Sequence, residues 1–95
     1  MTLTERETFN LKYISKLQHD KTKPTLSQVL QRLGSPDITE AKRIGNSEYQ
    51  IMFYRTRQVR SDSVTTKDEC TGLLFVDQQL VRWDKHSYRD YLAQQ

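Results

Sequence analysis

The sequence predicts an α+β fold in which two N-terminal helices pack on one face of a three-stranded antiparallel sheet, followed by a short C-terminal helix. The strands come from periodicity: between residues 48 and 54, every second residue from Tyr49 to Phe53 is apolar or aromatic. Two more apolar runs, 72–76 and 80–83, are three residues apart, a spacing typical of a hairpin. Before these runs, the apolar residues recur with helical spacing.

A first helix is predicted over residues 5–18. Thr4 and Glu7 match a capping box, in which each side chain bonds the backbone N–H of the other residue. Apolar residues then recur at helical spacing from Phe9 to Leu17. A polar linker that ends in a proline follows this helix.

A second helix is predicted to begin at Thr25, which forms another capping box with Gln28. Its apolar stripe ends at Leu33. Gly34 then occupies the position at which helices often end in a left-handed residue, and Pro36 prevents the helix from continuing. So short a helix is unstable alone, so we expect its stripe to pack on the sheet.

Two polar segments connect these elements. Residues 37–47 show no convincing period and are predicted to form a loop with a turn just before the first strand. Residues 61–69 form an excursion that is long for a hairpin connection, and we expect it to be mobile or functional. After the last strand, Ser87 is predicted to cap the short helix that holds Tyr91.

Length and composition set bounds on the protein class. Ninety-five residues predict one domain with frayed ends at 1–3 and 93–95. The formal net charge of +3 is too small to predict a dedicated nucleic-acid surface. No stretch has the length of a membrane span, and no signal peptide is visible, so the literal sequence resembles that of a soluble cytosolic protein.

The residues that could carry chemistry are few. A single cysteine, Cys70, excludes an internal disulfide and a multi-cysteine zinc site, although it could join two chains. His19 and His86 match no metal-ligand spacing and are expected on the surface. The acids Asp62, Asp68 and Glu69 fit a solvated loop better than a cation site. We therefore predict no catalytic residues, no metal and no cofactor.

A group of arginines forms the most suggestive pattern. Arg55, Arg57 and Arg60 follow Tyr54 without an intervening acid, and guanidinium groups bind carboxylates and phosphates and stack on aromatic rings. Two interpretations remain open: a binding edge, or charges that prevent edge-to-edge aggregation. The predicted contact residues are Tyr54, Arg55, Arg57, Arg60, Lys67, Asp68 and Trp83.

The second face of the sheet has two interpretations as well. Met52, Tyr54 and Leu74 have the parity opposite to that of the residues predicted to face the helices, which are Tyr49, Ile51, Phe53, Leu73 and Phe75. They would form either a bare contact surface or a second core covered by the last helix.

The helix motif carries a resemblance to a known family. Thr25, Gln28, Val29, Leu33, Gly34 and Pro36, followed by an aromatic strand and a hairpin ending in Val-x-Trp, resemble the SmpA/OmlA (BamE-like) family of small outer-membrane lipoproteins. The segments 53–56, 65–71, 74–75 and 80–83 resemble a domain-of-unknown-function family of that superfamily. The resemblance covers residues 22–83. The lipid-bearing cysteine near the mature N-terminus of that family is not found here, and Lys23-Pro24 replace its usual Gly-Met.

This resemblance implies two helices on a three-stranded sheet, a periplasmic location and a role through protein contacts. We expect a non-enzymatic interaction module whose partner is an envelope protein, a second copy of the chain or an anionic lipid, with no small-molecule substrate. The alternative is a small nucleic-acid-binding protein that uses Arg55, Arg57 and Arg60 for phosphates, although the weak net charge makes a nucleic-acid partner the less favoured one.

Overall fold

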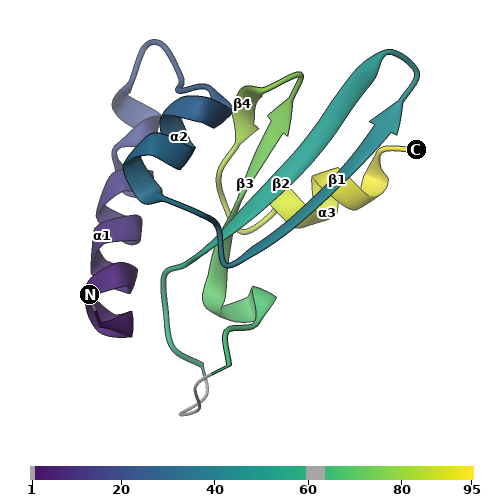
Figure 1. Cartoon of the computed structure of the whole chain (residues 1–95). Coiled ribbons are helices and arrows are strands. Elements are labelled where there is room, and N and C mark those ends of the chain that lie inside the picture. The colour runs from purple at the N-terminus through teal and green to yellow at the C-terminus, as the bar shows by residue number, and fades with distance from the viewer. Residues whose placement is uncertain (1, 60–63) are drawn as a thin grey trace.

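The structure, a computed structural model, describes residues 2–59 and 64–95 and contains a four-stranded antiparallel sheet with helices on both faces (Figure 1). The strands follow one another in the sheet in chain order. The elements are α1 (Leu3–Ser15), the 3-10 helix η1 (Leu17–His19), α2 (Leu26–Leu33), β1 (Ile38–Ile44), β2 (Ser47–Arg55), the 3-10 helix η2 (Lys67–Glu69), β3 (Cys70–Val76), β4 (Gln79–Arg82) and α3 (Ser87–Ala93).

The first helix begins earlier than predicted. Its capping box is formed by Thr2 and Glu5, because Thr2 Oγ1 accepts from the Glu5 N–H and Glu5 Oε1 accepts from the Thr2 N–H, both at 3.1 Å. Thr4 and Glu7 have the same spacing, but both lie inside the helix. The earlier start leaves the Glu7 carboxylate available for a contact with the sheet.

The second helix agrees with the prediction. Thr25 and Gln28 form the capping box, with bonds of 3.3 Å and 2.9 Å. Gly34 ends the helix with φ +78° and donates its N–H to the Leu30 carbonyl at 2.8 Å. Val29 is fully buried against the sheet, so the helix is stabilised by packing rather than by its own length.

The main correction concerns residues 37–47, where the structure has a strand instead of a loop. Strand β1 pairs antiparallel with β2, from Ile38 opposite Phe53 to Ile44 opposite Ser47. A two-residue turn joins them and begins with Gly45 at φ +61°. The strand was missed because only its first and last residues are large and apolar, so the alternation was hidden by charged side chains.

The register corrects the predicted faces of the sheet. Leu73 lies opposite Met52, and Leu74 lies opposite Ile51, and directly paired residues share a face. One core therefore joins Met52, Tyr54, Leu73, Phe75 and Leu80 to α1, η1 and α2, where they contact Ile14, Leu17 and Val29. Of the residues predicted to form the second face, Met52 and Tyr54 therefore lie under the two N-terminal helices, whereas Leu74 lies on the opposite face.

The opposite face forms a second, smaller core. Ile51, Phe53 and Leu74 pack there with Tyr91 of α3. The last helix thus folds back over the sheet, as one of the two interpretations predicted. Ser87 does not cap this helix but lies in its first turn, where its Oγ accepts from the Asp84 N–H at 3.0 Å.

Candidate interaction surface

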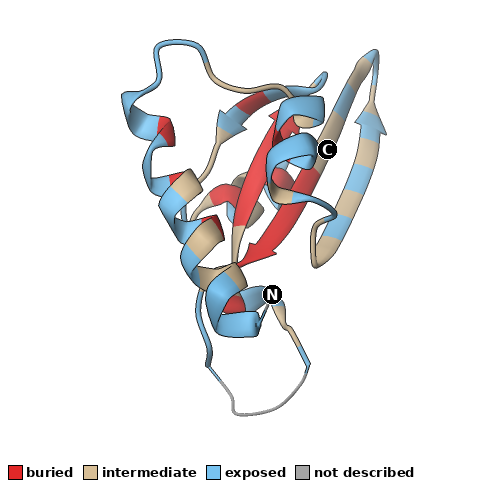
Figure 2. Cartoon of the chain, turned by 60° about the vertical axis from the view of Figure 1, so that its left-hand side comes forward, coloured by how far each residue is buried: buried red, intermediate tan, exposed pale blue. Residues whose placement is uncertain are grey.

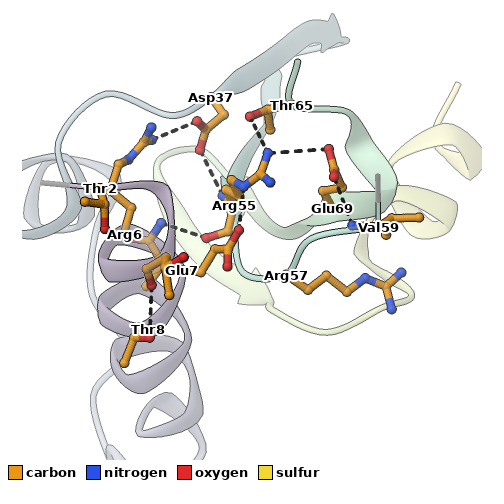
Figure 3. Close-up of polar contacts among 12 residues, drawn as sticks. Thr2, Arg6, Glu7, Thr8, Asp37, Arg55, Arg57, Val59, Thr65 and Glu69 are labelled. Carbon is orange, nitrogen blue, oxygen red and sulfur yellow. Dashed lines mark hydrogen bonds and ion pairs between the residues drawn. The ribbon is translucent and has the colours of Figure 1, made fainter. Parts of the chain in front are cut away.

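The side chain of Arg55 lies inside the protein, where only 1% of its surface is exposed. Its Nε donates to Glu7 Oε2 at 2.6 Å, and its Nη1 donates to Thr65 Oγ1 at 2.9 Å and faces Glu69 Oε1 at 3.5 Å (Figure 3). The hydrogen bond that Arg55 donates to the Glu7 carboxylate raises the pKa of the Arg55 guanidinium. We call this group, together with Asn10 and Asp37, the Arg55 node.

The Arg55 node also holds the backbone at the end of β2. Asn10 Nδ2 donates to the Arg55 carbonyl at 2.9 Å, and the Arg55 N–H donates to Asp37 Oδ2 at 2.9 Å. Asp37 in turn pairs with Arg6 of α1 at 2.7 Å. The node therefore joins α1, the start of β1 and the end of β2.

Glu69, which is fully buried, fixes both ends of the excursion between β2 and β3. Its Oε2 accepts from the Val59 N–H at 2.9 Å, and its Oε1 accepts from the Thr66 N–H at 3.1 Å. Its carbonyl accepts from the N–H groups of Thr56 and Arg57 at 2.9 Å and 3.1 Å. The motif at residues 65–71 thus has a structural role, which sequence patterns missed because a buried carboxylate has no periodic signature.

The predicted arginine edge is not formed as expected. Tyr54 is buried and donates its hydroxyl to the Gly34 carbonyl at 2.7 Å, and burial raises its pKa to about 12. Arg55 is also buried, whereas Arg57 is exposed beyond the end of β2 and bonds the Asp68 carbonyl through its Nε at 2.7 Å. Arg60 lies outside the described residues. An exposed strand of arginines beside Tyr54, which the nucleic-acid alternative requires, is therefore absent from the described chain.

Lys67 and Trp83, two further predicted contact residues, lie in different places. Lys67 pairs with Glu40 of β1 and donates to the Tyr88 hydroxyl at 3.0 Å, with its ammonium 4.5 Å from the centre of the Tyr88 ring. The Lys67 hydrogen bond lowers the pKa of Glu40. Trp83 follows β4 and is half-buried, with the Lys23 ammonium 4.9 Å from its ring centre.

The candidate nucleophile and the two imidazoles do not converge into a described site. Cys70 is half-buried, and burial raises its pKa to about 12, which disfavours the reactive thiolate. His19 is exposed and His86 half-buried. Over residues 2–59 and 64–95, no cluster of histidine, cysteine and acidic side chains could hold a metal ion.

A basic cleft of about 350 Å³ lies between α1 and α2. It is lined by Phe9, Lys12, Tyr13, Lys16 and Arg32, and the Arg32 guanidinium lies 5.1 Å from the centre of the Phe9 ring. Within the described chain, its three cations have no carboxylate at ion-pair distance. Sequence patterns missed this cleft because its cations come from two helices.

The open side of the sheet is the outer edge of β1, which we call the β1 edge. Strand β1 is an outermost strand, and its side chains at Thr39, Ala41 and Arg43 are exposed. Figure 2 shows the contrast: the second half of β2 and the middle of β3 are buried, whereas β1 and the first half of β2 are partly or fully exposed. In the described part of the chain, no segment pairs with this edge.

None of the described helices combines the length and apolar character that a membrane span requires. Comparison with known proteins found no curated protein and no solved structure that matches this chain. One family model matches residues 1–90, under the description "Protein of unknown function (DUF3192)". This match covers nearly the whole chain and includes β1, the Arg55 node and the first residues of α3. The chain therefore belongs to the DUF3192 family.

Proposed function

We propose that the protein is a non-enzymatic protein-interaction module of the Gram-negative cell envelope and that it recognises an extended segment of a partner by strand addition at the β1 edge. The observation that supports this most directly is the edge itself, a seven-residue strand with no neighbour on its outer side in the described chain. In strand addition, backbone hydrogen bonds provide affinity and alternate side chains provide specificity.

The envelope location rests on the sequence resemblance. The helix motif from Thr25 to Pro36 resembles that of the SmpA/OmlA family, whose members work at the outer membrane. We propose a periplasmic protein, held at the outer membrane as a lipoprotein, that assists outer-membrane assembly or maintenance. Fractionation of cells that express the native gene, with labelling by a radioactive fatty acid, tests this location.

A photo-crosslinking experiment in cells tests the recognition edge. A photoreactive amino acid at Thr39 lies at the β1 edge, whereas the same group at Arg89, a side chain with 67% exposure on α3, serves as the control. We expect a discrete covalent adduct from position 39 only, and its loss when Ala41→Pro removes a backbone donor of this edge. Equal labelling from both positions, or none from position 39, would contradict the proposal.

The basic cleft supports a second candidate function, binding to anionic lipid headgroups. Lys12 lies in the last turn of α1 and Lys16 is its C-cap residue, so the two like charges lie about one helical turn apart, and a bound anion would reduce the repulsion between them. Flotation with vesicles of anionic or zwitterionic lipid tests this idea. We expect binding to anionic vesicles that weakens with salt and is lost in Lys12→Glu/Lys16→Glu; binding that is unaffected by this double substitution would contradict it.

A further inference from the structure

The backbone groups at Thr39, Ala41 and Arg43 point away from the sheet. In an antiparallel ladder, successive residues of a strand bond alternately to one side and to the other. The Glu48 carbonyl bonds the Asp77 N–H across to the β3 side at 2.8 Å, so Tyr49, Ile51 and Phe53 of β2 bond towards β1. Their partners on β1 are Lys42, Glu40 and Ile38. The alternate residues of β1, Thr39, Ala41 and Arg43, therefore present their N–H and C=O groups outward.

These outward groups restrict how a second β1 strand could pair with the first. A symmetric antiparallel pair keeps all seven residues, Ile38–Ile44, in contact only when its two-fold axis passes through Ala41. In that register Glu40 lies opposite the Lys42 of the second copy, and this pair occurs twice. A shift of the axis by one residue, to Glu40 or to Lys42, places Glu40 opposite Glu40 or Lys42 opposite Lys42, and like charges directly opposite destabilise a sheet.

The side chains at this register are compatible with pairing. Glu40 and Lys42 fall at a non-hydrogen-bonded position, where cross-strand side chains come closest. Both already have partners within the chain, Lys67 for Glu40 and the carbonyls of Tyr91 and Gln94 for Lys42. The intermolecular pairs therefore select the register more than they increase affinity.

We infer that the partner at the β1 edge is a second copy of this chain, paired antiparallel through β1 about Ala41 to give a continuous eight-stranded sheet. This inference rests on the proposed recognition by strand addition. It gives a role to charged residues that would otherwise serve only to prevent aggregation of the edge. The first proposal also permits a different protein as the partner, and the experiments below distinguish that outcome from a homodimer.

Disulfide trapping measures the register directly. In a Cys70→Ala background, the two copies of Ala41→Cys face each other, at the 5.5 Å Cα separation typical of such a pair, which a disulfide can span. The two copies of Thr39→Cys are four residues out of register, roughly 14 Å apart, and cannot be joined. We expect a covalent dimer from position 41 at least about tenfold more abundant than from position 39. Equal trapping at both positions, or none at position 41, would overturn the inference.

Sedimentation of the otherwise unmodified chain provides an independent measurement. Wild-type protein and Ala41→Ser, which keeps the backbone N–H, should form dimers, whereas Ala41→Pro should sediment as a monomer with an unchanged circular dichroism spectrum. A monomeric wild-type protein would overturn the homodimer alone if photo-crosslinking from Thr39 captures a different protein. The absence of any adduct from Thr39 would overturn both proposals.

Discussion

The two edge strands of the sheet differ in length and in what lies beside them. Strand β4 has four residues, and the start of α2 closes it through a bridge between Thr25 and Gln79 and a 2.9 Å bond from the Leu26 N–H to the Gln78 carbonyl. Strand β1 has seven residues and, in the described chain, no such neighbour. Native proteins usually shorten, cover or charge an edge strand.

We expect the two sides of the sheet to have different roles, with stability depending on the closed side and association on the β1 edge. The closed side, which comprises β4, α2 and the Arg55 node, joins elements that are distant in sequence and keeps its polar groups bonded: the described residues include no buried side-chain nitrogen or oxygen without a partner. The β1 edge contributes few buried side chains. Substitutions on the closed side should therefore lower stability, whereas substitutions of outward groups at the β1 edge should alter association.

The largest effect is expected for Glu69→Ala. This change removes the carboxylate that accepts from the Val59 N–H and faces the Arg55 guanidinium. Arg55 keeps its bond to Glu7, so the expected cost is that of a buried donor left unsatisfied, about 1–3 kcal/mol. Urea unfolding followed by circular dichroism measures the loss. The exposed neighbour Asp68 provides the control, because Asp68→Ala should cost less than about 1 kcal/mol. Similar losses for the two variants would mean that the node does not anchor the closed side.

A smaller effect is expected where α2 meets β4. Thr25→Ala removes the capping hydroxyl, and the loss of such a cap costs about 1 kcal/mol. Thr22→Ala, at an exposed position in the preceding linker, should leave the unfolding free energy unchanged. If Thr25→Ala had no effect on thermal or urea unfolding, the closure of the β4 edge would not depend on this cap.

The turn between β3 and β4 offers a gain of stability. Asp77 and Gln78 have φ values of +50° and +70°, which side chains with a Cβ adopt at a cost. Gln78→Gly should therefore stabilise the protein by about 0.5–1 kcal/mol, since relief of the backbone strain exceeds the added flexibility of glycine in the unfolded chain. Gln79→Gly, in the adjoining strand, should destabilise it instead. The two midpoints of urea unfolding distinguish these outcomes.

A weak dependence of stability on acid pH is expected from the contact between Glu40 of β1 and Lys67 of η2. The hydrogen bond from Lys67 lowers the pKa of Glu40 in the folded protein. Because this pKa is lower in the folded protein, the Glu40–Lys67 contact stabilises the protein above the pKa that Glu40 has in the unfolded chain. This stabilisation is lost as the pH falls through the pKa of Glu40 in the folded protein. Glu40→Gln should remove this part of the decline in stability below about pH 5. An unchanged pH profile of thermal unfolding would show that the Glu40–Lys67 contact adds no stability.

The closed side was the more predictable part of the molecule. Capping chemistry located α2 because Thr25, Gln28 and Gly34 each satisfy a local backbone requirement. Periodicity located the central strands β2 and β3 for a similar reason. Which residues share a face was not predictable, because the pairing of Met52 with Leu73 depends on a register that the long excursion does not determine.

The open side and the polar interior were less predictable. Strand β1 carries charged side chains at Glu40, Lys42 and Arg43 because an edge strand needs no apolar partner on its outer side; its turn at Gly45 was the one local signal. The burial of Arg55 and Glu69 could not be predicted from local sequence, since charged residues become buried only when partners from distant segments meet them.

Hydrogen exchange at single amides of β1 tests the central claim most directly. In dilute protein, the amides of Thr39, Ala41 and Arg43 should exchange near the rate of an unprotected chain, whereas those of Glu40 and Lys42, which bond β2, should be strongly protected. As the concentration rises, the first three should become protected as second copies pair with the edge. Equal protection of all five amides in dilute protein would contradict an open β1 edge.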